Sequence, residues 1–117
     1  MKRQMLIIED EPNIRTMFQI MFQLEGIEAD LASNGKEALI LLGKHDYKAI
    51  SLDLKMPIMT GIELLHVLDK ELHKRVVVFS CYVDDALKEY PQVKFVLNKP
   101  EDMQEYIKVI KDLVNAT

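Results

Sequence analysis

Residues 51–61, SLDLKMPIMTG, mark the point where an apolar segment changes into a turn rich in proline and glycine. The segment before this turn, residues 49–52, has the length and apolar character of a buried strand. After the turn, Thr60 and Glu63 have the spacing of a helix N-cap and the glutamate that reaches back to it. Asp53 is the only carboxylate in the stretch. The stretch therefore predicts a strand, a turn and a helix in succession, with a negative charge at the end of the strand.

The same alternation continues along the whole chain. Four further segments have strand length and are bounded by polar residues, namely 5–8, 28–32, 76–79 and 95–97. Apolar residues at helical spacing lie between and after them. Parallel strands need crossover connections, and the crossover helices then cover both faces of the sheet. The predicted fold class is therefore α/β, a doubly wound sheet of five parallel strands. The helix around 84–89 has the weakest pattern, because Pro91 follows it closely.

Length and composition limit the possible functions. The chain has 117 residues, of which 49% are hydrophobic and 29% charged, which suits one domain with one core. We therefore expect a single domain over residues 1–117, with no output domain in this chain. Fifteen basic against nineteen acidic residues give a net charge of −4, which argues against direct nucleic-acid binding.

The chain also has no membrane-spanning or secretory pattern. No apolar run approaches the roughly 20 residues of a membrane span, and the start MKRQMLIIEDEP does not resemble a signal peptide. We expect a cytoplasmic protein with no membrane contact. The single cysteine, Cys81, cannot form an internal disulfide and is expected to be a small core residue. His45, His66 and His73 show no metal-ligand spacing and are expected at the surface.

Polar residues follow four of the predicted strands. Residues 9–11 (Glu-Asp-Glu) end the first strand, Asp53 ends the third, Ser80 the fourth, and residues 98–100 (Asn-Lys-Pro) the fifth. Ligands of parallel α/β sheets bind outside the carboxyl ends of the strands. The four groups should therefore meet at one edge of the sheet.

Three of these residues are carboxylates: Glu9, Asp10 and Asp53. Carboxylates gathered at one place repel one another unless a cation joins them, and Mg²⁺ prefers such oxygen ligands. Lys99 and Ser80 are then suited to contact phosphoryl oxygens. Asp53, beside a metal and facing a lysine, is placed to attack phosphorus and become an aspartyl phosphate. Taken singly, each residue has a plainer structural interpretation, such as a turn cap or a surface lysine, and their joint occurrence favours the site.

Four motifs in this order resemble the receiver domain of two-component response regulators, the CheY-like superfamily. They are Ile7-Ile8-Glu9-Asp10-Glu11-Pro12, Leu52-Asp53-Leu54-Lys55-Met56-Pro57 with Thr60-Gly61, Val78-Phe79-Ser80, and Leu97-Asn98-Lys99-Pro100. The resemblance spans the chain and implies a sheet of order 2-1-3-4-5 flanked by five helices. It also implies the function of a phosphoacceptor in a two-component phosphorelay.

The resemblance implies particular roles for the residues at the strand ends. Asp53 would be the phosphoacceptor, and Ser80 and Lys99 would bind the phosphoryl group. Mg²⁺, with Mn²⁺ as a substitute, would be held by Glu9, Asp10, Asp53 and the backbone carbonyl of Lys55. Phosphate would come from a phosphohistidine on a sensor histidine kinase or a histidine phosphotransfer protein. Transfer and autodephosphorylation would be self-catalysed, so the domain is not expected to be a turnover enzyme. The modified domain would then act on a downstream effector protein or an output domain.

The sequence departs from the family pattern at two places that bear on the structure. Val96 stands where the family has its switch aromatic residue, and the segment 80–99 is short, which predicts an abbreviated fourth helix. The main alternative function is an unphosphorylated receiver-like protein-interaction module, although such modules usually lack an acid or the lysine. A haloacid dehalogenase-type phosphatase would need a second aspartate where Lys55 stands. A flavodoxin-like carrier would not place the acids of residues 9–11 beside a phosphate.

Overall fold

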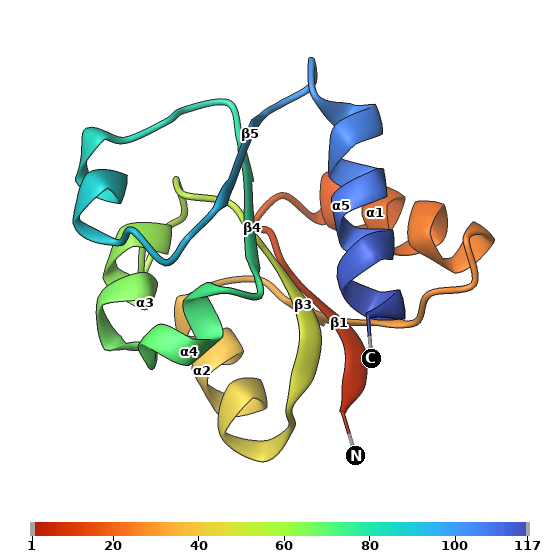
Figure 1. The fold of residues 1–117 in the computed structure, drawn as a ribbon, viewed down its shortest axis with the longest axis horizontal. Coiled ribbons are helices and arrows are strands. Elements are labelled where there is room, and N and C mark those ends of the chain that lie inside the picture. The colour runs from red at the N-terminus through yellow and green to blue at the C-terminus, as the bar shows by residue number, and fades with distance from the viewer. Residues whose placement is uncertain (1, 117) are drawn as a thin grey trace.

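The computed structural model describes residues 2–116. Its five strands are β1 Arg3–Ile8, β2 Ala29–Ala32, β3 Tyr47–Leu52, β4 Val76–Ser80 and β5 Phe95–Asn98. They form one parallel sheet in the order β2-β1-β3-β4-β5 (Figure 1). Each predicted strand is confirmed, and each observed end lies within two residues of its expected position. The predicted fold class and strand order are therefore correct.

Four α-helices and one 3₁₀ turn connect the strands, and a fifth α-helix follows the last strand. They are α1 Pro12–Leu24, α2 Gly35–Lys44, α3 Gly61–Val67, α4 Lys70–His73, α5 Met103–Asn115 and the 3₁₀ turn η1 Asp85–Glu89. Helices α1 and α5 cover one face of the sheet, and α2, α3 and α4 cover the other (Figure 1). The connection from β4 to β5 contains the short η1 turn, as the short segment predicted. None of the described helices is both long and apolar enough to cross a bilayer.

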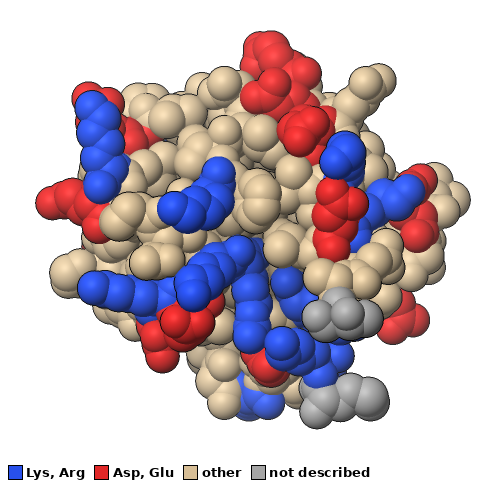
Figure 2. Space-filling view, in the orientation of Figure 1, with Lys and Arg blue, Asp and Glu red and all other residues tan. Residues whose placement is uncertain are grey.

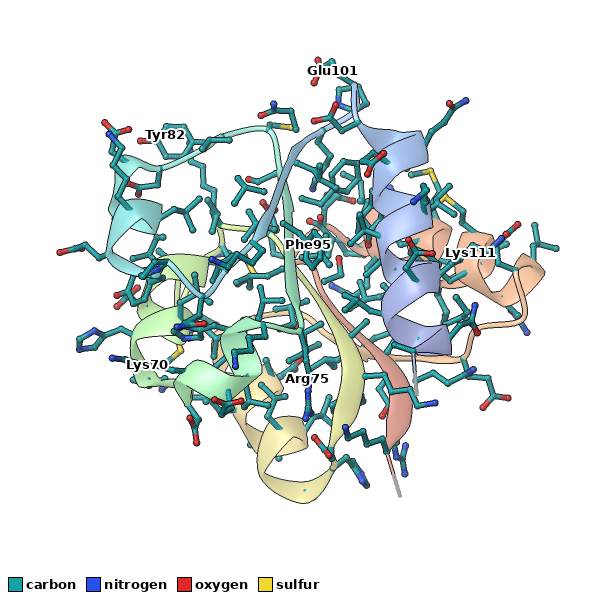
Figure 3. The ribbon with its side chains drawn as sticks, viewed as in Figure 1. Lys70, Arg75, Tyr82, Phe95, Glu101 and Lys111 are labelled. Atoms are coloured by element: carbon teal, nitrogen blue, oxygen red, sulfur yellow. The ribbon has the colours of Figure 1, made fainter. Side chains whose placement is uncertain are left out.

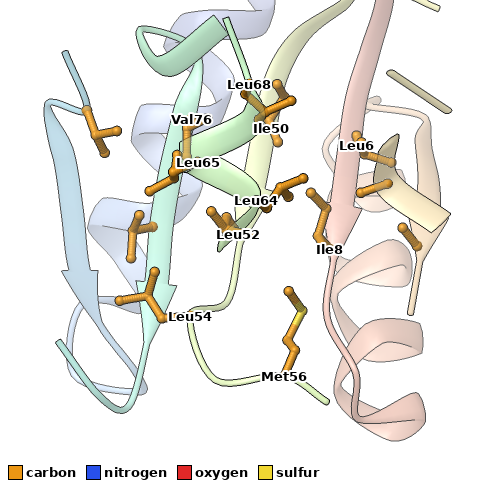
Figure 4. Packing of buried hydrophobic residues seen from close by; sticks show 14 of the residues in the cluster. Leu6, Ile8, Ile50, Leu52, Leu54, Met56, Leu64, Leu65, Leu68 and Val76 are labelled. Atoms are coloured by element: carbon orange, nitrogen blue, oxygen red, sulfur yellow. The ribbon is translucent and has the colours of Figure 1, made fainter. Parts of the chain in front are cut away.

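The core consists of two apolar layers, one on each face of the sheet. Figure 4 shows the layer beneath α2 and α3, where Ile8, Leu52 and Leu64 pack together. The other layer, beneath α1 and α5, contains a group of aromatic side chains, in which the rings of Phe79 and Tyr106 stack with centroids 4.1 Å apart. Because helices cover both faces, the sheet strands are apolar in near-continuous runs rather than alternating. This explains why the strands could be recognised from short apolar runs.

Two expectations about single side chains were wrong. Cys81 is exposed, because β4 ends at Ser80 and residue 81 lies beyond the helices that cover the sheet. His73 is buried with 3% of its surface exposed. Its Nε2 lies 2.8 Å from the carbonyl oxygen of Leu65, and its ring stands edge-on to Tyr90. A hydrogen-bond partner and an aromatic neighbour make burial of this histidine possible.

Charged side chains are unevenly spread over the surface. In Figure 2, Lys and Arg side chains gather in the lower half of the visible face, and acidic side chains gather at its upper edge. Lys2, Lys48 and Arg75 line a pocket of about 530 Å³ near the start of β1 and β4 and the end of α5. Glu101, labelled in Figure 3, lies at the opposite end of the molecule. Lys and Arg side chains are therefore concentrated toward one end of the visible face, although acidic side chains also lie among them.

The helix α3 begins with the predicted capping box. Thr60 Oγ1 accepts a hydrogen bond from the Glu63 amide at 3.1 Å, and Glu63 Oε1 accepts one from the Thr60 amide at 3.0 Å. Loss of such a cap typically costs about 1 kcal/mol. We expect Thr60→Ala to lower the free energy of unfolding in urea by about this amount. Thr16→Ala, at an exposed position within α1, is the control and should not destabilise, because alanine is the better helix former. Equal losses in both variants would contradict the role of the cap.

Candidate functional site

The carboxyl ends of β1, β3, β4 and β5 bring the predicted site residues together. Glu9 and Asp10 directly follow β1, and Asp53 directly follows β3. One carboxylate oxygen from each of these three residues lies within 4.8 Å of the others. The parallel registers, in which Ile8 pairs with Leu52, cause this juxtaposition, since the residues after paired positions must also be neighbours. The predicted acidic cluster is therefore present in the structure.

Lys99, directly after β5, places its ammonium group between two of these carboxylates. Its Nζ lies 2.6 Å from Glu9 Oε1 and 3.7 Å from Asp53 Oδ2. Water reaches little of this group, because the exposed side-chain fractions are 9% for Lys99, 3% for Glu9 and 12% for Asp53. The ammonium group also lies 5.8 Å from the centre of the Phe18 ring. Lys99 is therefore a buried counter-ion of the acidic cluster and not a surface lysine.

Burial and ion pairing have opposite effects on the pKa values of Glu9 and Lys99. Burial raises the pKa of Glu9 above its ordinary value, and the hydrogen bond and charge of Lys99 offset only part of this effect. Burial alone lowers the pKa of Lys99, but the hydrogen bond to Glu9 and the charge of Asp53 outweigh it, so the pKa of Lys99 is raised. Lys99 therefore carries its positive charge at neutral pH.

Ser80, the last residue of β4, contacts the other side of Asp53. Its hydroxyl donates a hydrogen bond to Asp53 Oδ1 at 2.7 Å, and the backbone amide of Tyr82 donates to the same hydroxyl at 3.3 Å. Ser80 is 1% exposed. Asp53 thus lies between a hydroxyl and an ammonium group, which are the two kinds of donor that suit phosphoryl oxygens.

Two further residues lie in the loop and helix that follow Asp53. Lys55 is exposed in the loop between β3 and α3, where it lines a pocket of about 410 Å³ together with Tyr82 and Asp84. Gly61 is buried at the start of α3. A Cβ atom on Gly61 would lie 2.7 Å from the carbonyl oxygen of Asp53, so only glycine lets α3 approach the strand end this closely.

Arg15 is a residue of this site that the sequence interpretation missed. Its Nη1 donates hydrogen bonds to the carbonyl oxygens of Glu9, at 2.7 Å, and of Asp10, at 3.2 Å. An arginine near the start of a helix that follows an acidic loop was visible in the sequence. Nothing local, however, indicated that its side chain would turn back toward that loop.

The donor set suits a hard divalent cation. Three carboxylates converge, two of them shielded from water, and hard oxygen donors of this kind favour Mg²⁺, Mn²⁺ or Ca²⁺ over softer metals. Lys99 balances part of the negative charge. The cluster could therefore bind a metal ion, and a phosphoryl group bound between the ion, Ser80 and Lys99 would find charge compensation on three sides.

Comparison with known proteins places this chain in a family. The family model of the response regulator receiver domain matches residues 5–111. The chain is 31% identical to sporulation initiation phosphotransferase F of Bacillus subtilis over 95% of this chain and 93% of that protein. It is 32% identical to the probable transcriptional regulator ycf29 of Porphyra purpurea over 97% of this chain and 57% of that protein. It is also 33% identical to the regulatory protein AtoC of Escherichia coli, over 69% of this chain and 18% of that protein.

Solved structures show the same likeness. The receiver domain of the Francisella response regulator 1452 has a TM-score of 0.82 and 28% identity, over 97% of each chain. The response regulator TrrA of Thermotoga maritima, solved in complex with Mg²⁺–BeF, has a TM-score of 0.81 and 28% identity, over 95% of this chain and 98% of that one.

The sheet order, the acidic cluster and the family match define a CheY-like receiver domain of two-component regulatory systems. The chain belongs to the response regulator receiver domain family. Members of this family take part in signalling with kinases and effectors, and a phosphoacceptor function fits this family.

Proposed function

We propose that residues 1–117 act as a single receiver domain in which Asp53 accepts the phosphoryl group. One observation carries the assignment to this aspartate: its carboxylate receives the Ser80 hydroxyl at 2.7 Å and faces the Lys99 ammonium group at 3.7 Å. The oxygens of Glu9 and Asp10 complete the cluster within 4.8 Å. Beyond these three acids, no carboxylate of the described chain belongs to such a group.

The metal in this proposal is Mg²⁺, with Mn²⁺ as a substitute. Asp10 and Asp53 would ligate it directly, Glu9 would hold it largely through water, and the backbone carbonyl of Lys55 would add a further ligand. When bound, the ion neutralises negative charge on the phosphoryl oxygens. Support comes from the three converging carboxylates and from the position of Lys55 two residues beyond Asp53.

The residues of the chain perform the transfer in one step. A carboxylate oxygen of Asp53 attacks the phosphorus atom of a phosphohistidine, the phosphorus–nitrogen bond breaks, and the imidazole leaves with its electron pair and takes up a proton. The Ser80 hydroxyl moves its hydrogen bond from Asp53 to a phosphoryl oxygen. Lys99, which remains protonated because its pKa is raised, donates to another.

The partners in this proposal follow from the chemistry. The donor is a sensor histidine kinase or a histidine phosphotransfer protein, and the phosphorylated domain acts on a downstream effector protein or an output domain. Each domain modifies itself once and then loses the phosphate by hydrolysis, so it is not a turnover enzyme. Direct contact with nucleic acid or membrane is not proposed, and a cytoplasmic location remains a prediction of the sequence.

The test is phosphorylation by acetyl phosphate or phosphoramidate, followed by intact mass. We expect one phosphoryl group per chain in the presence of Mg²⁺ and none in the presence of a chelator. Borohydride reduction of the acyl phosphate and peptide mapping should locate the modification at Asp53. If no adduct forms, and if Mg²⁺ with beryllofluoride leaves the amide spectrum of the protein unchanged, the domain is an unphosphorylated protein-interaction module instead.

A further inference from the structure

Arg15 holds the acidic loop of the site from the side of α1. Its Nη1 donates to the carbonyl oxygens of Glu9 and Asp10, at 2.7 and 3.2 Å, and the residue is partly buried. None of the ion pairs between described residues involves Arg15. The hydrogen bonds of its guanidinium therefore go to the backbone of the loop, and its charge also acts on Glu37, whose pKa it helps to lower.

The two acids of this loop depend on Arg15 to different degrees. The Glu9 amide also donates to the Ala32 carbonyl at 3.1 Å, and Glu9 Oε2 accepts a hydrogen bond from the Glu11 amide at 3.2 Å. For Asp10, the contact with Arg15 is the single hydrogen bond found among the described residues. Without Arg15, Glu9 would keep three of its anchors, including the one to Lys99, whereas Asp10 would keep none.

We propose that Arg15 is a positioning residue that fixes Asp10 for Mg²⁺ and makes the site prefer Mg²⁺ to the larger Ca²⁺. The inference rests on the metal site of the proposed function. Mg²⁺ requires near-ideal octahedral ligands at about 2.0–2.1 Å, whereas Ca²⁺ accepts six to eight ligands at about 2.3–2.6 Å in flexible arrangements. A loop held from behind by two hydrogen bonds favours the ion with the stricter geometry. A loosened loop loses more affinity for Mg²⁺ than for Ca²⁺.

The positive charge of Arg15 has the opposite effect on the affinity for Mg²⁺. A guanidinium near a divalent cation repels it, so removal of the charge alone would tighten the binding of both ions. Positioning and charge therefore predict opposite changes in Mg²⁺ affinity when Arg15 is replaced by an apolar residue. Lysine keeps the positive charge and can still donate to both carbonyl oxygens from one nitrogen, as Nη1 does here. Its compact ammonium group on a flexible stem should nevertheless hold the loop less firmly than arginine does.

The experiment measures Mg²⁺ and Ca²⁺ dissociation constants by isothermal titration calorimetry for the wild type, Arg15→Met and Arg15→Lys. We expect Arg15→Met to weaken Mg²⁺ binding about 10- to 100-fold, as loss of an outer-shell partner does, and Ca²⁺ binding by a smaller factor. The Mg²⁺ affinity of Arg15→Lys should lie between that of the wild type and that of Arg15→Met. Arg75→Met is the control, because Arg75 also donates to a backbone carbonyl, that of Tyr47 at 3.1 Å. It lies at the opposite end of the sheet (Figure 3).

Two outcomes would overturn the inference. If Arg15→Met binds both ions as tightly as the wild type or more tightly, Arg15 does not position the loop. If the binding of Mg²⁺ and the binding of Ca²⁺ weaken by the same factor, Arg15 does not set the preference of the site for Mg²⁺. Circular dichroism and thermal unfolding check that the variants are folded. If Arg15→Met is not folded, the same two criteria are applied to Arg15→Lys. Failure of the wild type to bind Mg²⁺ would instead remove the metal site itself, and the two failures are thereby distinguished.

Discussion

Replacing Asp53 with asparagine is expected to abolish the phosphoryl adduct completely while the domain remains folded. The amide has no carboxylate oxygen to attack phosphorus, and no second aspartate in the site receives both a hydroxyl and an ammonium group. The fold should survive, because the amide oxygen of the new side chain can still accept the Ser80 hydrogen bond. Lys99 keeps Glu9 as its partner at 2.6 Å.

The measurement is intact mass after incubation with acetyl phosphate and Mg²⁺, with unfolding in urea as the check on the fold. Asp85→Asn is the matched control: its side chain is 99% exposed, and it should be phosphorylated like the wild type. An adduct of undiminished yield on Asp53→Asn would show that the phosphoryl group is attached elsewhere. The assignment of the phosphoacceptor would then be wrong even though the chain is a receiver domain.

Replacing Lys99 with methionine is expected to lower the free energy of unfolding by about 3–5 kcal/mol at pH 7 in metal-free buffer, the usual cost of removing one partner from a buried pair. Methionine has a similar length, so the packing against Phe18 changes little. Glu9 and Asp53, however, lose the cation that lies 2.6 and 3.7 Å away. Phosphorylation should fall as well, because Lys99 no longer balances charge on the phosphoryl group.

The pH dependence gives the same prediction a distinct signature. The folded-state pKa of Glu9 is already above the ordinary value of 4.5, so the folded protein binds this proton more tightly than the unfolded chain does. Such a group stabilises the fold at pH values below the ordinary pKa, and this stability is lost as the pH rises through the raised pKa. Without Lys99 the pKa of Glu9 rises further. The penalty in Lys99→Met should therefore shrink as the pH is lowered.

Urea unfolding at several pH values tests this, with a chelator present. The double variant Lys99→Met/Glu9→Gln should recover most of the lost stability, because it removes the unpaired buried charge together with its partner. Lys108→Met is the control, since Lys108 pairs with Asp112 at the surface and should change stability by at most about 0.5 kcal/mol. A Lys99→Met variant as stable as Lys108→Met would contradict the interpretation of Lys99 as a buried counter-ion.

Much of the fold was predictable from local patterns. Apolar runs such as residues 49–52 and 76–79 predicted strands because both faces of this sheet are covered, which makes its strands apolar in runs. Thr60 and Glu63 predicted the start of α3, since a capping box involves only four consecutive residues. The abbreviated β4–β5 connection followed from its length alone. Each of these features depends on neighbours in the sequence.

The features that the sequence did not predict depend on residues that are neighbours in space. Asn34 and Glu37 have the same spacing as Thr60 and Glu63, and Asn34 caps α2, but Glu37 reaches past it to the amide and hydroxyl of Ser33. His73 was expected at the surface, and it is buried because Leu65 supplies an acceptor and Tyr90 an aromatic surface. The spacing of these residues in the sequence predicts neither contact.

The sequence by itself determined the order of the strands and the polar residues that follow four of them. Because parallel strands must all point the same way, it also determined that those residues share one edge. Only the tertiary structure decided how they pair. Lys99 contacts Glu9, 90 positions earlier in the chain, more closely than it contacts Asp53, and Arg15 turns back to hold the backbone beside them. Such contacts depend on the distances between side chains after the sheet has assembled, and hydrophobic periodicity carries no information about those distances.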